Sequence, residues 1–430
     1  MRSPRVCVLG SGTSYLSGIS YYTIMLTRAL VPHAEVSVIL MRRLIPRFLY
    51  PGKERVGKVL TGLSVADYAP TFDGVDWYLL PSIVKASQFL LRQRPEVVVL
   101  QWWTGAVLIP YWWLAKLARI RGAQIIIEFH EDQDTGEAAV PVLARIGQWG
   151  IRRLISLASA FVTHSEWDRR RLSGLLGVNE GLLSVIPHGP YSMAVDLCDA
   201  RGDDAGQSQR GSTGRASPTA RGDRDAMAPL TRNRPLGEPV ESPSGRGKGY
   251  KSSITILFFG TIRPYKGLED LVDAFGLLPR DTNRIWRLLV VGETWEGWTL
   301  PVEKIKASRH RDDIELVNRY VADEEVVAYF ARADIVALPY VRSSASGPLH
   351  LTMSVGLPVV ITRVGGLVEA AQGYSGTVFV PPHEPEALAA ALVEAAALTT
   401  VSHRDEHTWA DVGEGYSALF STLLGPRPKS

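Results

Sequence analysis

The feature that most constrains the fold is an alternation of short apolar runs with helical patterns, which occurs in each half of the chain. In the first half, continuous apolar runs are predicted to be strands at Val6–Leu9, Glu35–Leu40, Val97–Leu100, Gln124–Phe129, Ala160–Thr163 and Ser184–Ile186. Between several of them, apolar residues recur at helical spacing, as over Ser20–Leu30, Tyr111–Ile120 and Trp167–Leu176. Strands that are apolar throughout and alternate with helices indicate a parallel sheet covered on both faces.

The same alternation restarts in the second half. Its predicted strands are Ile254–Phe259, Leu288–Val291, Ile314–Val317, Ile335–Leu338, Val359–Ile361 and Val378–Val380. The sequence therefore predicts an α/β protein with two Rossmann-like, doubly wound domains of similar size that face each other across a cleft. Clefts of this kind are preferred ligand sites.

Residues 192–252 interrupt the alternation. This segment is rich in Gly, Ser, Pro, Arg and Asp and contains almost no large apolar residue. It cannot bury enough surface to offset the entropy that ordering would cost. We therefore predict a disordered insert between a first domain at 1–191 and a second domain at 253–400.

The composition narrows the class of protein. A formal net charge of +3 over 430 residues gives no support to a nucleic-acid partner. The two cysteines, Cys7 and Cys198, suggest neither a disulfide framework nor a metal cluster. The apolar run Val6–Leu9 is too short for a signal peptide, and no window approaches the roughly 18 apolar residues of a membrane span. We therefore predict a cytoplasmic protein.

A glycine-containing loop after the first strand raises the hypothesis of a nicotinamide-dependent oxidoreductase. Gly10 and Gly12 fit the first two positions of G-x-G-x-x-G, but Tyr15 stands where the third glycine belongs. The dinucleotide fingerprint also requires an acidic residue at the end of the second strand, and this chain has none there. What remains is a loop of small residues that lets a ligand approach the backbone.

The turn after the strand Ile254–Phe259 carries the strongest chemical signal. In FFGTIRPYKGLEDLVDAF, Gly260 ends the strand, and Arg263 and Lys266 precede a helical pattern. Both cations would stand beside a helix N-terminus, where free amides and the helix dipole already favour an anion. The turn predicts a diphosphate site, and the alternative is a pair of solvated surface cations.

With the second domain in view, the chain resembles the family-4 retaining glycosyltransferases of the GT-B fold. The match is most specific in FFGTIRPYKGLEDLVDAF, where Arg263 and Lys266 occupy the positions that hold the donor diphosphate in that family. Fixed cations there would stabilise the charge that develops on the departing nucleoside diphosphate. The resemblance implies that the donor binds mainly to the second domain and the acceptor mainly to the first.

Further segments match the family in the same order along the chain. Their motif positions are occupied by Gly18 in the first glycine loop, His130 facing the reacting sugar, Glu166 near the cleft, His188 at the end of the first domain and Glu369 in the second. The resemblance implies catalytic roles for His130, Arg263 and Lys266, donor contacts through Gly18, Gly260 and Glu369, and acceptor-side roles for Glu166 and His188. Residues 401–430, which include Trp409, resemble a terminal helix that crosses back to the first domain.

One motif departs from the family. Two glutamates, eight residues apart, usually contact the reacting sugar and the nucleotide ribose, but Ser343 and Leu351 stand at those positions. The stretch SSASGPLHL instead resembles a variant with a Ser-Gly turn, which implies donor contacts through Ser346, Gly347 and Leu349. The absent carboxylates raise a second hypothesis, a non-catalytic GT-B protein that binds a sugar nucleotide or a partner.

The resemblance also implies the substrates. The donor would be a UDP- or GDP-linked sugar, the acceptor a glycan, a lipid-linked molecule or a small molecule, and the reaction a front-face substitution with retention of configuration. The family does not require metal. Asp132 and Asp134 have the D-x-D spacing of some metal–nucleotide sites, but loop carboxylates are usually just solvated, so we predict no metal site and no other cofactor.

A basic segment suggests a membrane surface. Residues 40–58 contain six basic residues and one acid, interleaved with Leu, Ile, Phe and Tyr. This mixture suits an anionic membrane and predicts peripheral association with its inner face. The alternative is a surface loop that packs on the first domain, and two tryptophan pairs at 102–103 and 112–113 fit either interpretation.

Overall fold

The computed structural model describes residues 3–12, 18–43, 64–76, 80–130, 150–191, 252–280, 284–295, 297–343 and 345–425. Within these residues the first sheet has seven strands, all paired in parallel in the order β3-β2-β1-β4-β5-β6-β7. The strands are β1 (Arg5–Ser11), β2 (Glu35–Arg43), β3 (Thr71–Asp76), β4 (Val97–Trp102), β5 (Gln124–Phe129), β6 (Ala160–Thr163) and β7 (Leu183–Val185).

The second sheet is also parallel and follows the same winding. Its order is β10-β9-β8-β11-β12-β13 among the described residues. The strands are β8 (Ser252–Phe259), β9 (Arg284–Val291), β10 (Ile314–Val317), β11 (Ile335–Leu338), β12 (Val359–Thr362) and β13 (Thr377–Val380). The predicted pair of doubly wound domains is therefore confirmed. In both sheets the order reverses, between β1 and β4 and between β8 and β11, and ligands bind at such switch points.

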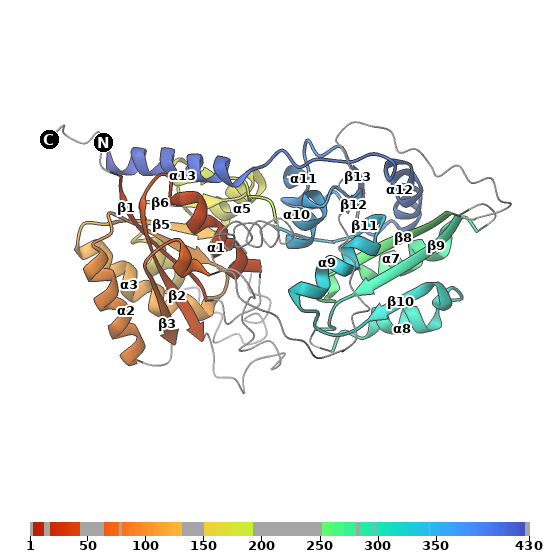
Figure 1. Ribbon diagram of the computed structural model, residues 1–430, viewed down its shortest axis with the longest axis horizontal. Coiled ribbons are helices and arrows are strands. Elements are labelled where there is room, and N and C mark those ends of the chain that lie inside the picture. Colours follow the sequence, from red (N-terminus) through yellow and green to blue (C-terminus); the bar gives the residue numbers. More distant parts are fainter. Residues whose placement is uncertain are drawn as a thin grey trace, which may run out of the picture.

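Helices cover both faces of each sheet (Figure 1). The first domain has α1 (Gly18–Leu30), α2 (Leu80–Gln93), α3 (Leu108–Ile120) and α5 (Glu166–Leu176). The second has α7 (Leu268–Leu277), α8 (Leu300–Ala307), α9 (Asp323–Arg332), α10 (Gly347–Ser354), α11 (Leu367–Ala370) and α12 (Pro385–Leu398). The last helix, α13 (Trp409–Leu424), returns to the first domain and packs on α1. One core lies under α1 and α13, and a second lies under α2 and α3.

The two domains share an apolar core. Tyr21 of α1 stacks on Tyr191 at a ring distance of 4.4 Å, and both belong to the same buried cluster as α10 residues of the second domain. The Ser354 hydroxyl donates to the Tyr191 carbonyl at 2.6 Å, and the Trp409 indole donates to the Pro190 carbonyl at 2.9 Å. These contacts hold the carboxyl edges of the two sheets toward each other.

One strand differs from the prediction. Residues 71–76 read TFDGVD, whose glycine and two aspartates obscure the apolar pattern, yet they form the edge strand β3. Of the predicted insert at 192–252, Ser252 begins β8 and residues 192–251 lie outside the described residues, as does most of the basic segment, from 44 to 58. None of the described helices has the length and apolar character that crossing a bilayer would need.

Candidate active site

The cationic turn of the second domain leaves β8 at the switch point of its sheet. Gly260 has φ +124°, and a Cβ built on it would lie 3.7 Å from the Pro348 side chain, so the turn passes close to the start of α10. Gly267 has φ +62°, and a Cβ there would lie 2.0 Å from the Pro339 carbonyl. Only glycine fits at 267, because the backbone is left-handed and the neighbouring carbonyl leaves no room for a side chain.

Arg263 and Lys266 both lie against aromatic rings. The short helix Pro264–Lys266 joins them, with Arg263 as its N-cap residue. The Arg263 guanidinium lies 4.6 Å from the centre of the Trp295 ring, and the Lys266 ammonium lies 3.8 Å from the centre of the Tyr340 ring. Lys266 is only 9% exposed. A cation held over a ring face keeps its full charge while its stem is fixed, which preorganises it for an incoming anion.

The N-terminus of α10 lies beside this turn. Ser346 caps the helix, since its hydroxyl accepts from the Leu349 amide at 3.3 Å and donates to the Tyr340 hydroxyl at 3.4 Å. Tyr340 therefore connects Lys266 to the cap. The Leu349 side chain is buried in the apolar core, and its amide is used by Ser346. Because Pro348 has no amide hydrogen, Gly347 supplies the first-turn amide that the cap does not use.

The two positions that carry glutamates in the resembling family offer no carboxylate here. The Ser343 hydroxyl donates to the Ala345 carbonyl at 2.9 Å, within its own loop. Leu351 is 6% exposed and belongs to the core that the two domains share. An apolar side chain has thus taken over the second position, and its role is packing.

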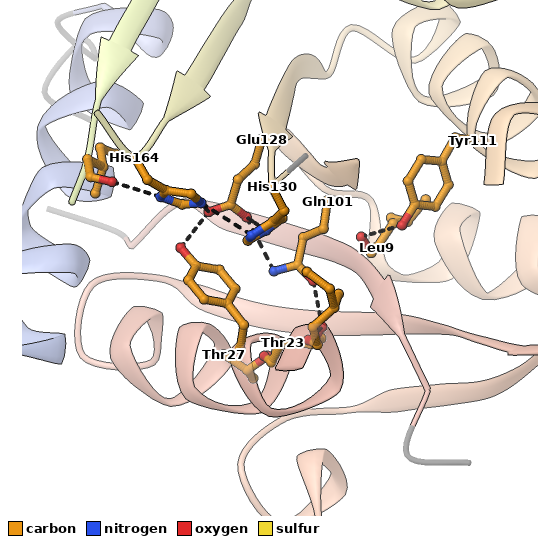
Figure 2. Close-up of polar contacts among 11 residues, drawn as sticks. Leu9, Thr23, Thr27, Gln101, Tyr111, Glu128, His130 and His164 are labelled. Carbon is orange, nitrogen blue, oxygen red and sulfur yellow. Dashed lines mark hydrogen bonds and ion pairs between the residues drawn. The ribbon is translucent and has the colours of Figure 1, made fainter. Parts of the chain in front are cut away.

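A buried polar network lies at the carboxyl edge of the first sheet (Figure 2). Glu128, in β5, is fully buried and accepts from the Tyr22 hydroxyl at 2.5 Å and from the Gln101 amide at 3.3 Å. Burial would raise the pKa of Glu128, but the charges of His130 and His164 and the hydrogen bonds it accepts lower it to about 2. Glu128 is therefore ionised at neutral pH.

His130 and His164 complete the network. Nε2 of His130 lies 3.4 Å from Glu128 Oε2, and Nδ1 of His130 lies 3.2 Å from Nε2 of His164. Nδ1 of His164 lies 3.0 Å from the Ile186 carbonyl, which can only accept, so this nitrogen carries a hydrogen. Burial, helped by the charge of His130, lowers the pKa of His164 to about 4. His164 is thus neutral at pH 7, and its Nε2 accepts a hydrogen bond from His130.

Glu128, His130 and His164 are also close enough to be tested as metal ligands. They offer one carboxylate oxygen and two imidazole nitrogens within 4.8 Å of one another. However, the two nitrogens of His130 face different partners, Glu128 on one side and His164 on the other. A single ion could use this set only if the His130 ring turned, so the arrangement fits a hydrogen-bonded network better than a metal site.

The remaining acceptor-side predictions lie around the domain interface. His188 stacks on His350 of α10 at a ring distance of 4.4 Å, which joins the domains through two imidazoles. Burial lowers the pKa of His350 to about 4 and lowers the pKa of His188 well below its usual value, so both rings are neutral at pH 7. The Glu166 side chain points outward, where it is 43% exposed and pairs with Arg169 at 2.7 Å.

Glu369 contacts the first domain. Its carboxylate accepts from the Glu166 amide at 2.6 Å and from the Trp167 amide at 2.8 Å, at the N-terminus of α5. The next amide, that of Asp168, donates to the Ser165 hydroxyl at 3.0 Å. The first three amides of α5 are therefore satisfied, two of them by a residue more than 200 positions away.

A cavity of about 200 Å³ lies between the domains beside these groups. It is lined by His164, Ser165, Val185, Pro187, His188, Ala345, His350, Gly366, Glu369, Ala370, Gln372 and His407. This volume is smaller than the roughly 300–1,000 Å³ of typical ligand pockets. The described residues thus enclose room for part of a ligand, such as one sugar ring.

The structure brings the predicted residues together in two groups. Gly260, Arg263, Lys266, Ser346 and Gly347 meet at the switch point of the second sheet. His130, Glu166, His188 and Glu369 lie at or near the facing edge of the first sheet, and Gly18 begins α1, which follows β1. Glu128 and His164 are not among the residues predicted from the sequence. A glutamate inside the apolar run IIIEF was the available signal, because a lone carboxylate in a buried strand needs partners.

Comparisons with known proteins identify the two domains. Residues 17–189 match the model of the glycosyl transferase 4-like domain, and residues 253–397 match that of glycosyl transferases group 1. A D-inositol 3-phosphate glycosyltransferase of Xylanimonas cellulosilytica is 26% identical over 420 residues, which cover 90% of this chain and 87% of that protein. A second, from Nocardia farcinica, is 25% identical, with coverage of 96% and 86%.

Two solved structures share the fold of this chain along nearly its whole length, although their sequence identity to it is low. Anabaena Alr3699/HepE, in complex with UDP and glucose, has a TM-score of 0.57 and 14% identity, covering 97% of this chain and 100% of that one. Sucrose-phosphate synthase from Thermosynechococcus elongatus has a TM-score of 0.56 and 16% identity, covering 98% and 95%. With both domains matched in order and the fold shared along the whole length, the chain is a glycosyltransferase of the GT-B fold that joins a glycosyl transferase 4-like domain to a group 1 domain.

Proposed function

We propose that this chain transfers a sugar from a UDP- or GDP-linked donor to an acceptor hydroxyl, with retention of configuration. The observation that carries the proposal is the convergence of Arg263, Lys266 and the Gly347 amide at the switch point between β8 and β11. A diphosphate placed there meets two fixed cations and a helix N-terminus. One protein of the same fold, Anabaena HepE, was solved with UDP and glucose and also with UDP-glucose, which supports a nucleotide sugar as donor.

The chemical step follows from the charges. As the bond between the anomeric carbon and the diphosphate breaks, the leaving oxygens gain negative charge that Arg263 and Lys266 stabilise. The acceptor hydroxyl attacks from the same face as the leaving group and gives its proton to the departing diphosphate. These two cations take the place of a metal ion, and we propose that none is required.

The buried network of the first domain fixes the ring of His130. Because Nε2 of His164 accepts, Nδ1 of His130 must donate, and Nε2 of His130 then faces the ionised Glu128. These contacts hold the ring of His130 in one orientation, and we propose that this ring faces the reacting sugar.

We propose only the chemical class of the acceptor, on the basis of the relatives' names. Curated relatives are named for D-inositol 3-phosphate, a small phosphorylated polyol, whereas another relative is an O-antigen chain mannosyltransferase. The acceptor of this chain is therefore a glycan, a lipid-linked molecule or a small polyol, and it enters on the first-domain side, near His188 and Glu166.

Nucleotide binding to matched variants tests the proposal. Arg263→Met and Lys266→Met should each weaken UDP or GDP binding by about 1–3 kcal/mol in titration calorimetry, because each removes a charge-assisted contact. Lys306→Met, which removes an exposed lysine of α8, should leave binding unchanged. Unchanged nucleotide affinity in both site variants would refute the placement of the diphosphate at this turn.

Transfer or hydrolysis of a donor sugar in the presence of EDTA, with the product anomer assigned by NMR, tests metal independence and retention.

A second candidate, a non-catalytic GT-B protein, is favoured by Ser343 and Leu351. A protein with a buried leucine at the second glutamate position lacks a carboxylate for the ribose there. This alternative predicts nucleotide binding that depends on Lys266 without turnover of any UDP- or GDP-sugar, whereas the transferase releases nucleoside diphosphate.

A further inference from the structure

The outer faces of α2 and α3 expose apolar side chains to an unusual extent. Fourteen large hydrophobic residues are exposed in the part of the chain that the structure describes, and five belong to these two helices. They are Leu80 (73% exposed), Val84 (49%), Ile109 (55%), Trp113 (49%) and Ile120 (70%). Scattered exposed hydrophobic residues are normal on protein surfaces, but a concentration on two neighbouring helices marks an interaction surface.

These residues form one continuous face. Leu80 and Val84 are four residues apart on α2, and Ile109 and Trp113 are four residues apart on α3, so each pair shares a helix face. The Trp113 indole donates to the Ser87 hydroxyl of α2 at 3.0 Å, one turn after Val84. The apolar stripe of α3 therefore borders that of α2, and the two helices lie side by side on the same side of the first sheet (Figure 1).

The charge of this face has one sign. Neither α2 nor α3 contains an aspartate or a glutamate, whereas both carry exposed basic residues. These are Lys85, Arg92, Lys116 and Arg119. Lysine is depleted at protein–protein interfaces. Basic residues among aliphatic side chains and a tryptophan are instead the composition of surfaces that bind anionic bilayers.

We propose that the outer face of α2 and α3 docks the enzyme on an anionic phospholipid membrane, with Leu80, Val84, Ile109 and Trp113 inserting at the headgroup level. The face differs from the basic segment predicted from the sequence, and it requires nothing of the donor chemistry. Failure of this proposal would therefore leave the proposed transfer reaction intact.

The outer face of α2 and α3 lies where membrane docking would bring the acceptor side of the cleft close to the bilayer. Helix α2 follows β3 and α3 follows β4, so their first turns lie near the carboxyl edge of the first sheet. The same edge carries His130, at the end of β5. A membrane held against Leu80 and Trp113 would border the acceptor side of the cleft, where a lipid-linked acceptor could reach the site without leaving the bilayer.

Co-sedimentation of the full chain with lipid vesicles tests the proposal. Vesicles of phosphatidylcholine alone are compared with vesicles that contain one quarter phosphatidylglycerol, at low and at physiological salt. The double variant Ile109→Ser/Trp113→Ser removes the apolar contacts, and Lys85→Glu/Lys116→Glu reverses the charge. Their matched controls are Leu277→Ser on α7, where the leucine is 51% exposed, and Lys306→Glu on α8.

We expect the wild type to bind the anionic vesicles and to lose binding as salt rises. Each double variant should lower the bound fraction about tenfold, with circular dichroism and thermal melting unchanged, and both controls should bind like the wild type. Equal binding by the variants and controls would overturn the proposal, as would no binding to anionic vesicles. A dimer in light scattering that Ile109→Ser/Trp113→Ser dissociates would assign the face to a second copy and would overturn it too.

Discussion

The two edges of the cleft hold their charged groups in different ways. On the second domain, Arg263 and Lys266 belong to one short turn and lie over the rings of Trp295 and Tyr340. On the first domain, the buried charge belongs to a network whose members come from α1, β4, β5 and the end of β6. The first arrangement is local in sequence, whereas the second is built from distant segments.

This difference separates two physical tasks. A site that must take up the charge of a leaving group benefits from cations whose positions are fixed, here over aromatic rings. A site that must hold one histidine ring in a fixed orientation benefits from polar contacts on both sides of the ring, because burying a polar group without contacts is costly. Substitutions that remove charge from the first-domain edge should therefore lower stability. Substitutions that remove charge from the second-domain edge should weaken donor binding.

The largest expected effect comes from Glu128→Gln. The substitution keeps the shape and the bond from Tyr22 but removes the buried negative charge that the surrounding donors stabilise. Breaking a buried charged contact typically costs about 3–5 kcal/mol, and because the glutamine amide still makes hydrogen bonds we expect a loss of about 3 kcal/mol in the free energy of unfolding. Urea denaturation at pH 7 measures this loss.

The matched control for that variant is Glu315→Gln. Glu315 also lies in a strand and pairs with Arg332, but both side chains are about half exposed, so the loss should stay below about 1 kcal/mol. If Glu128→Gln were as stable as the wild type, the buried charge of Glu128 would not stabilise the fold, and the comparison between the two edges would fail on the first-domain side.

The next effect concerns pH. His164 and His350 have pKa values of about 4 in the folded chain, below the usual 6.5, because both are buried. The unfolded chain takes up protons at these positions near pH 6.5 while the folded chain resists until about pH 4, so stability falls as the pH drops through this window. Each histidine should remove about 1–2 kcal/mol between pH 7 and pH 5.

His350→Phe isolates one of these two contributions. Phenylalanine preserves the stacking on His188 but cannot titrate, so the variant should lose about 1–2 kcal/mol less than the wild type between pH 7 and pH 5. Unfolding free energies measured by urea denaturation at both pH values give the comparison. An identical pH dependence in the two proteins would show that the acid sensitivity arises elsewhere.

The difference between the edges also explains what the sequence could predict. The strands that are apolar throughout were predicted within a few residues, and the turn with Arg263 and Lys266 was recognised because its signal lies within one stretch. The strand β3 was missed because Gly74 and two aspartates break its apolar pattern. The roles of Glu128 and His164 could not be predicted, since each depends on partners contributed by other segments of the fold.

Glu369 illustrates the same limit from the opposite domain. The family resemblance suggested a donor contact, but nothing in its local sequence indicates that its carboxylate would meet the amides of Glu166 and Trp167. Only the folded arrangement of both domains creates this contact. A single residue can therefore serve the donor, the domain interface or both, and the sequence alone does not separate these roles.

The smallest expected effect, and the one that separates those roles, comes from Glu369→Ala. Removing an N-cap acceptor costs about 0.5–2 kcal/mol, so we expect about 1 kcal/mol in the free energy of unfolding and a more open arrangement of the domains. A larger radius of gyration in small-angle X-ray scattering, with nucleotide affinity unchanged, would identify a domain latch. Weaker nucleotide binding with an unchanged radius would instead assign Glu369 to the donor.

Glu386→Ala is the matched control, because it removes an exposed carboxylate from the first turn of α12. If Glu369→Ala changed neither property beyond this control, the contact would be passive, and the two domains would be held together by their other contacts, such as the shared core of Tyr21, Tyr191 and α10 and the stack of His188 on His350.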